Sequence, residues 1–268
     1  MNLHPTNSVT CRHLLHLALL ISAPLAAQQP THESPAIPAP TRNLIVLDPA
    51  HGGSDSGAHL KDNLLEKDLT LALAGRLKAT LTAHGFQVIT TRDGDTDPTS
   101  DQRAEQANHA HPSVCLLIHA SNSGSGAYLA SSSLSPSTDE RIALPWDTAQ
   151  AAFVGDSTSL LDLANKAFTS AKVPVITLRS SVPPIDSLTC PALLLELAPN
   201  ARTPVTDADY QQNVADALTA AITTFRDQND TLIKNANPDA ATPPPAKPKT
   251  PKPATPKPAA PKPTGAAQ

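Results

Sequence analysis

The chain has 268 residues, of which 40% are apolar and only 3% aromatic, so any core must be built from aliphatic side chains. This length suits one sizeable domain with extensions, or two small domains. The formal net charge of −4 excludes an overall basic protein of the kind that binds nucleic acid, and no nucleic-acid partner is expected.

The charge is unevenly distributed along the chain. Arg12 is the only charged residue before Gln28, and residues 243–268 contain five lysines and no acid. The remaining residues, 28–242, hold 14 basic and 24 acidic side chains, a charge of −10. The tail is therefore the only strongly basic stretch of the chain.

Residues 1–27 predict an export signal. Arg12 precedes an apolar run, Leu14–Ala27, which is shorter than the ~20 residues of a spanning helix and ends in small residues. Cleavage is expected near Ala27, and an exported chain would act in the periplasm or cell envelope. An uncleaved membrane anchor is the alternative, because Leu25 stands where a small residue is usual before a cleavage site.

The rest of the chain divides by composition. Residues 28–42 are rich in Pro, Ala and Gln without periodicity and predict a linker, and the fold is expected over residues 43–236. Residues 237–268 consist mostly of Pro, Ala and Lys, which cannot bury a core and favour an extended, disordered tail. The tail is interpreted as a spacer, with contact to an anionic polymer as the alternative.

The first structural unit is a strand, a loop and a helix. Residues 44–47 are continuously apolar, which is typical of a strand buried on both faces, and a glycine-containing loop follows at 48–53. Leucines recur every four residues from Leu69 to Leu81 before Gly85, the pattern of an amphipathic helix with its terminating glycine.

Further strands and helices alternate along the chain, with 131–137 as a loop and 139–153 unassigned. The expected strands are 86–91, 114–118, 127–130, 173–178 and 192–197, and the expected helices are 100–110, 156–171 and 207–227. This alternation predicts an α/β fold: a single three-layer domain, with a mostly parallel or mixed sheet and helices on both faces, flanked by disordered ends.

Four polar residues stand where such a sheet places its ligands, outside the carboxyl ends of strands. His51 lies in the first loop, His119 ends one buried strand, Glu196 lies near the end of another, and Glu66 falls in the first turn of a helix. Two imidazoles and a carboxylate are the ligand set of an open, catalytic zinc site. A further carboxylate would then serve as general base.

Each of these residues also has a structural interpretation. Asn63 and Glu66 have the spacing of a helix capping box. His51, beside two glycines, is also typical of a turn. His119 is also compatible with a buried histidine whose ring nitrogens form hydrogen bonds within the core. Glu196 follows three leucines, where an unpaired carboxylate is costly to bury, so a functional role is favoured. The other histidines considered are expected to be solvated or capping: His59, His84, His109 and His111.

Several motifs together resemble the zinc-dependent N-acetylmuramoyl-L-alanine amidases of cell-wall metabolism. They are Asp48-Pro49-Ala50-His51-Gly52-Gly53, Leu65-Glu66-Lys67-Asp68, Thr91-Arg92-Asp93, Arg103 with Ala107-Asn108, Ile118-His119-Ala120 and Leu195-Glu196-Leu197. The resemblance implies that His51, Glu66 and His119 bind zinc, which favours the ligand role of Glu66 over capping. It also implies that Glu196 is catalytic.

The resemblance further implies hydrolysis of the amide between N-acetylmuramic acid and L-alanine, with peptidoglycan as the partner. The alternatives are another zinc peptidase or amidase acting on wall peptides, and a non-catalytic wall-binding module. No activator protein is identified by the sequence. The chain departs from the family pattern at two single residues, Ala50 and Ser121, and in one short segment, Ala198-Pro199-Asn200.

Three further predictions concern structure around the site. Arg103 and Asn108 are expected to tie their helix to the surroundings of the site rather than to contact substrate. Cys115 and Cys190 are the cysteines left after the export signal. An exported chain meets an oxidising compartment where they can pair, but the sequence leaves the pairing open.

Overall fold

The computed structural model describes residues 40–137 and 144–236. The expected export signal (1–27), nearly all of the expected linker (28–42) and the expected tail (237–268) lie outside the described residues. Among the described helices, none combines the length and apolarity needed to cross a membrane.

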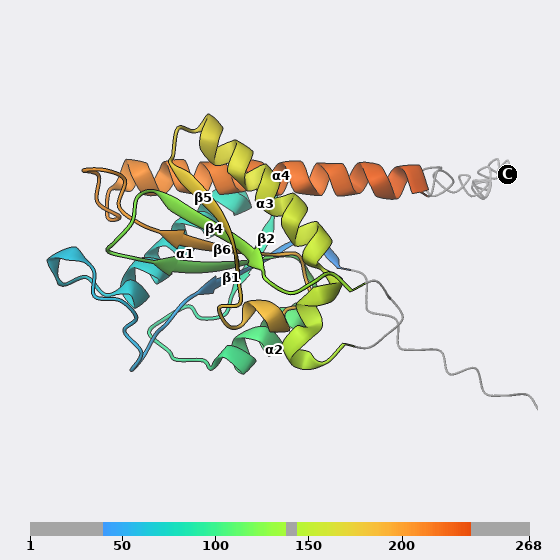
Figure 1. Ribbon diagram of the computed structural model, residues 1–268, viewed down its shortest axis with the longest axis horizontal. Coiled ribbons are helices and arrows are strands. Elements are labelled where there is room, and N and C mark those ends of the chain that lie inside the picture. Colours follow the sequence, from blue (N-terminus) through green and yellow to red (C-terminus); the bar gives the residue numbers. More distant parts are fainter. Residues whose placement is uncertain (1–39, 138–143, 237–268) are drawn as a thin grey trace, which may run out of the picture. The chain divides into compact units, whose positions relative to one another are not determined.

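A six-stranded mixed sheet forms the centre of the fold (Figure 1). The strands are β1 (Thr41–Pro49), β2 (Gln87–Thr90), β3 (Pro112–Ala120), β4 (Ala127–Ser132), β5 (Val175–Ser180) and β6 (Ala192–Leu197). Their order across the sheet is β2-β1-β3-β6-β4-β5. Strands β2, β1, β3 and β6 are mutually parallel. Strand β4 runs antiparallel to β6, and β5 is parallel to β4.

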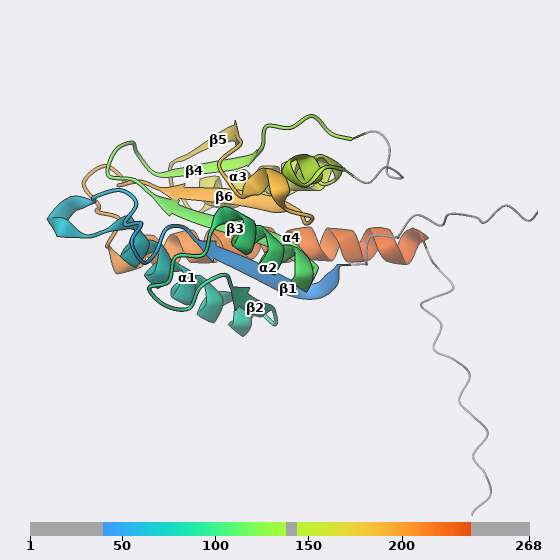
Figure 2. The same cartoon turned by 90° about the horizontal axis from the view of Figure 1, so that it is seen from below.

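Helices cover both faces of this sheet, which confirms the expected three-layer α/β domain. The larger core lies between one face and helices α1 (Glu66–Ala83), α3 (Val154–Ser170) and α4 (Ala208–Ala236). The smaller core lies under α2 (Ser100–Ala110) and the short helix η3 (Ile185–Ser187) on the other face. Figure 2 shows α2 lying across β1 and β3, on the face opposite α4.

Burial on both faces explains the continuous apolar runs in the sequence. Along β3, Leu116 and Ile118 enter the larger core, while Cys115 and Leu117 enter the smaller one. Because successive side chains of a strand point to opposite faces, a strand covered on both sides needs no polar positions. His119 continues the alternation and therefore projects on the α2 side, beyond the end of the smaller core.

Several elements are longer in the structure than the sequence pattern predicted, and β4 takes in the first two residues of the expected loop 131–137. β1 begins at Thr41, inside the expected linker, and α4 continues to Ala236 rather than ending at Asp227. The last turns of α4 are mostly polar and leave Leu232 and Ile233 exposed, so they lack the apolar face by which a helix is recognised. Arg42 bonds to Asp230, and this contact joins β1 to α4.

The unassigned segment 139–153 is described from residue 144 onward. It contains the short helix η2 (Trp146–Ala152). The buried Gln150 side chain donates to the carbonyl oxygens of Leu188 and Cys190, at 2.8 and 2.9 Å. These contacts anchor η2 beside the start of β6, whereas Glu196 lies near the other end of that strand.

A disulfide joins Cys115 of β3 to Cys190, two residues before β6. Both cysteines are buried in the smaller core, and they are 75 residues apart in sequence. The bond thus links β3, which carries His119, to the segment that leads into β6, which carries Glu196.

Removing this disulfide with Cys115→Ala and Cys190→Ala is expected to lower the free energy of unfolding by about 4 kcal/mol, because the crosslink restricts a long loop of the unfolded chain. Alanine at both positions avoids burying a new polar group. Chemical denaturation of the oxidised wild type and the double variant would measure the difference. Equal stabilities would show that the bond does not constrain the unfolded chain.

Candidate metal centre

Three of the predicted site residues come together at the carboxyl ends of the parallel strands. His51 lies in the loop after β1, Glu66 is the first residue of α1, and His119 is the penultimate residue of β3. Each offers one ligand atom, and these atoms lie within 4.8 Å of one another. The two imidazole rings are nearly perpendicular, with centroids 5.5 Å apart. The arrangement is a possible metal site built from two nitrogens and one carboxylate.

Glu66 stands between the two histidines and is only 4% exposed. Its Oε2 atom lies 3.2 Å from His51 Nε2, and its Oε1 atom lies 3.2 Å from His119 Nδ1. The backbone amides of Ala58 and Ala120 donate to the same two oxygens, at 2.8 and 3.0 Å. The carboxylate is thereby fixed in orientation between loop, helix and strand.

The capping interpretation of Glu66 is wrong. The N-cap of α1 is Leu65, no side chain caps that helix, and Asn63 belongs to the short helix η1 (Lys61–Asn63). A capping box is instead found at α2, between Thr99 and Gln102. Glu66 is the first residue of α1, whereas a capping box needs the carboxylate at the third helical position. Its oxygens instead accept hydrogen bonds from the Ala58 and Ala120 amides.

Opposing effects act on the pKa of Glu66. Burial raises it, but the hydrogen bonds from His119, Ala58 and Ala120 and the charge of His51 lower it, and the net shift is downward. A carboxyl with a lowered pKa is ionised at neutral pH. Glu66 therefore has the charged form that a metal ligand requires.

His51 is oriented by Asp55, four residues further along the chain. His51 Nδ1 lies 2.7 Å from Asp55 Oδ2, and this hydrogen bond is the largest of the effects that hold the pKa of Asp55 below its usual value. The opposite ring nitrogen, Nε2, faces Glu66. A carboxylate bonded to the outer nitrogen of a histidine is the usual support of a metal-binding imidazole. Asp55 was not predicted from the sequence, although a carboxylate four residues after a histidine is a signal that could have indicated it.

Gly57 allows the close approach of His51 and Glu66. A Cβ atom at this position would lie 2.5 Å from His51 Cδ2 and 2.7 Å from Glu66 Oε2, and the backbone φ angle is +62°. Any side chain would therefore collide with the cluster and strain the backbone. Gly57 was not predicted from the sequence, because a single glycine in a loop is compatible with many backbone conformations.

Two buried arginines hold the loop that carries His51. Arg103 pairs with Asp48 at 2.7 Å and donates to the carbonyl oxygens of Pro49 and His51, each at 2.8 Å. Arg92 donates to the carbonyl oxygens of Pro49 and Ala50, at 2.9 and 3.0 Å. The expected supporting role of Arg103 agrees with this geometry, and Arg92 shares it.

Asn108 ties α2 to the segment before β6, which lies at the opposite end of that strand from Glu196 rather than in the expected surroundings of the site. Its side chain donates to the Ser187 carbonyl oxygen at 2.8 Å and accepts from the Thr189 amide at 2.7 Å. His111 is the C-cap of α2, in the left-handed conformation. His111 therefore caps a helix, as expected, and does not belong to the cluster.

Glu196 is placed beside the cluster by strand register. In β6 it pairs with His119 of β3 on one side and with Tyr128 of β4 on the other. Paired residues share a face of the sheet, so all three side chains project on the α2 side. Within the described residues, the half-buried Glu196 carboxylate has no hydrogen-bond or ion-pair partner. A proton acceptor thus stands next to the possible metal site.

A model of the family described as N-acetylmuramoyl-L-alanine amidase matches residues 45–224, about two thirds of the chain. The chain belongs to this amidase family. The match includes all four residues of the predicted site and both cysteines. It agrees with the resemblance carried by the sequence motifs.

Relatives of this amidase-family chain are found among curated proteins and solved structures. The germination-specific N-acetylmuramoyl-L-alanine amidase of Bacillus subtilis is 38% identical over 90 residues, which cover 28% of this chain and 38% of that protein. The chain therefore spans well under two thirds of that relative.

Two solved structures share the fold. The catalytic domain of the amidase CwlV from Bacillus (Paenibacillus) polymyxa is 26% identical with a TM-score of 0.54, covering 69% of this chain and 98% of that one. The amidase Ami1 from Mycobacterium smegmatis is 20% identical with a TM-score of 0.58, covering 70% and 100%. The second likeness concerns the fold alone.

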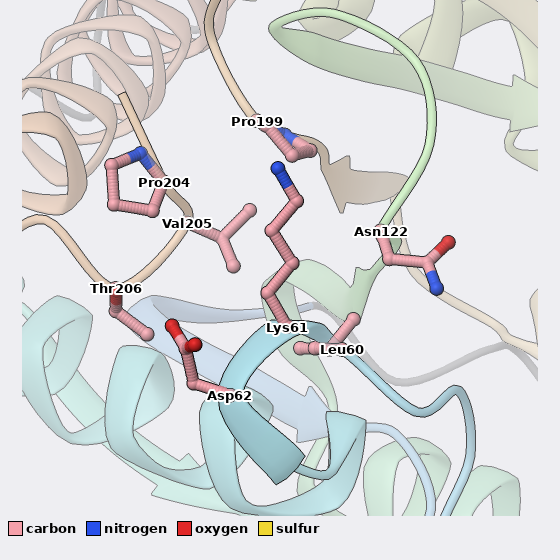
Figure 3. A pocket seen from close by; sticks show the side chains of 8 residues that line it. All are labelled: Leu60, Lys61, Asp62, Asn122, Pro199, Pro204, Val205 and Thr206. Carbon is pink, nitrogen blue, oxygen red and sulfur yellow. The ribbon is translucent and has the colours of Figure 1, made fainter. Parts of the chain in front are cut away.

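A small hollow lies on the same rim of the amidase domain (Figure 3). Its lining comes from the loop between β1 and α1, from Asn122 after β3, and from residues 199–206 after β6. Figure 3 shows the Lys61 side chain extending across the hollow toward Pro199. The hollow is not lined by His51, Glu66, His119 or Glu196. It is therefore separate from the cluster, although the loop between β1 and α1 contributes residues to both.

Proposed function

We propose that this chain hydrolyses the amide bond between N-acetylmuramic acid and L-alanine in peptidoglycan, using zinc held by His51, Glu66 and His119. The observation that carries the proposal is the convergence of these three side chains within a domain of the amidase family. Membership of the family supports the substrate, and the donor atoms support the metal.

The residues fit zinc by their chemistry. Two imidazole nitrogens and one carboxylate oxygen form a three-ligand set of the catalytic type, which leaves a coordination position for water or substrate. The ionised Glu66 and the Asp55 support of His51 complete the set. When bound, zinc would supply Lewis acidity, which polarises a carbonyl and makes water more acidic.

Glu196 is the proposed general base and acid. Its carboxylate would take a proton from the attacking water, and the same proton would pass to the amide nitrogen as the carbon–nitrogen bond breaks. The products are a carboxylic acid on the sugar and a free amine on alanine. Amines leave poorly unless protonated, so both transfers need this carboxylate. The unpartnered state of Glu196 among the described residues supports the role.

The chain is further proposed to act outside the cytoplasm, in the periplasm or cell envelope. The signal-like composition of residues 1–27 supports export. The buried Cys115–Cys190 disulfide also supports it, because such bonds persist in oxidising compartments.

Digestion of purified peptidoglycan, with and without a chelator, tests the function. Mass analysis of the products is expected to find free peptides that begin with L-alanine, and the chelator should abolish their release until zinc is restored. Peptides cleaved internally would instead identify a zinc peptidase. Binding to the wall without any product would identify a non-catalytic module. Either result would overturn the proposed amidase activity.

A further inference from the structure

One row of side chains crosses four strands on the site face of the sheet. His119 pairs with Glu196, Glu196 pairs with Tyr128, and Tyr128 pairs with Ile176 of β5. Residues paired in this way lie side by side on one face. The row therefore leads from the metal cluster, through the proposed base, to the edge of the sheet.

The outer part of this row is apolar and open. Ile176 is 47% exposed, and Leu178, two residues along the same face of β5, is 46% exposed. The residues that pair beside Leu178, in β4 and β6, are Ala130 and Leu194, and they are buried in the smaller core. Tyr128, Ile176 and Leu178 thus form an apolar strip that begins next to Glu196.

Tyr128, the first residue of this strip, is supported by a neighbouring loop. Its hydroxyl oxygen accepts a hydrogen bond from the Ser125 amide at 3.3 Å. Its ring packs on Gly124, where an added Cβ would lie 2.5 Å from the hydroxyl oxygen. Both contacts belong to the loop that follows His119 in the chain. An aromatic side chain supported by this loop therefore lies beside the base.

The proposed chemistry gives the row a direction. The carbonyl under attack must lie over the metal cluster, and the departing nitrogen must lie within hydrogen-bond reach of Glu196. A substrate chain that continues from that nitrogen in line with the row passes Glu196 and leads away from His119. The next side chains in that direction are those of Tyr128 and Ile176.

We infer that the apolar strip binds the peptide leaving group of the substrate and sets the preferred peptide length. The inference rests on the proposed amide hydrolysis. Ile176 lies two strands from Glu196, about 10 Å at the usual strand spacing, and extended peptide covers ~3.3 Å per residue. The strip accordingly accommodates about three residues, starting with the alanine whose nitrogen is released.

Kinetics with two soluble substrates test the inference: N-acetylmuramoyl-L-alanine, and an N-acetylmuramoyl tripeptide that begins with L-alanine. The test variant is Ile176→Thr with Leu178→Thr, which keeps side chains suited to a strand while removing apolar area. Its KM for the tripeptide substrate is expected to rise about tenfold, because the lost burial weakens binding. Its kcat, and both constants for the single-residue substrate, should stay unchanged.

Thr177→Ala is the matched control, since Thr177 is exposed on the opposite face of the same strand and should change neither KM. A binding titration of the tripeptide substrate to Glu196→Gln, with and without the two threonines, should give the same tenfold ratio without turnover. The inference would be overturned if the double variant had the same KM for the tripeptide substrate as the wild type. An equal rise in KM for the single-residue substrate would also overturn it, because that substrate lacks the residues that the strip is inferred to bind. Failure of the wild type to cleave either substrate would instead overturn the proposed function.

Discussion

Replacing Glu196 with glutamine is expected to lower kcat at least a hundredfold while leaving the zinc content unchanged. The substitution keeps the size of the side chain but removes the group that accepts and returns the proton. Positioned acid–base groups typically contribute factors of ~10²–10⁴ to rate. Glu196 stands outside the cluster of His51, Glu66 and His119, so its loss should not release the metal. Product release from peptidoglycan and elemental analysis of the purified variant would measure the two quantities.

Glu105→Gln provides the matched control, because Glu105 is an exposed carboxylate on α2. This variant should retain both activity and zinc. A parallel loss of zinc in Glu196→Gln would mean that Glu196 is a ligand rather than a base. Full activity without the carboxylate would remove Glu196 from the reaction altogether.

The sequence predicted best those site residues that interrupt a continuous apolar pattern. His119 and Glu196 follow runs of buried aliphatic side chains at strand ends, where a polar group needs a specific reason to be present. Their pairing across β3 and β6 depends on the strand order, which the sequence did not predict, since only a mostly parallel or mixed sheet was expected. Strand alternation and the position of functional groups at strand ends are local or topological rules, so the sequence carries them directly.

Glu66 was ambiguous because its partners are distant in sequence. The amides that fix its carboxylate belong to Ala58 and Ala120, 8 and 54 residues away. Local sequence offered only the capping residue Asn63, and the structure excludes that interaction. The family motif, rather than helix chemistry, gave the ligand interpretation.

Other supporting features depend on tertiary contacts that no local pattern encodes. The buried hydrogen bonds of Arg92 and the steric need for glycine at Gly57 arise only when loop, helix and strand meet. The disulfide was left open for the same reason. A disulfide requires the two Cα atoms to lie close together. Those of Cys115 and Cys190 are 6.2 Å apart because β3 pairs with β6.

His51→Ala is expected to reduce zinc affinity by more than about a hundredfold and to abolish activity with it, since the proposed ligand set has three members. Asp55→Asn should give a graded result, because it weakens the support of the His51 ring without removing a ligand. Removing a group that supports a metal ligand without itself binding the metal typically lowers metal affinity ~10–100-fold. Zinc titration against a competing chelator would rank the wild type and the two variants.

His59→Ala separates a ligand effect from general damage to the loop. His59 lies in the same connection between β1 and α1, but its side chain is exposed and outside the metal cluster. Its removal should leave zinc affinity within about twofold of the wild type, on the scale of ordinary surface substitutions. The order wild type, Asp55→Asn, His51→Ala in decreasing affinity is required if Asp55 acts through His51. Wild-type affinity in His51→Ala would refute the ligand set. Wild-type affinity in Asp55→Asn alone would confine the error to the role of Asp55, because the three ligands would still bind as proposed.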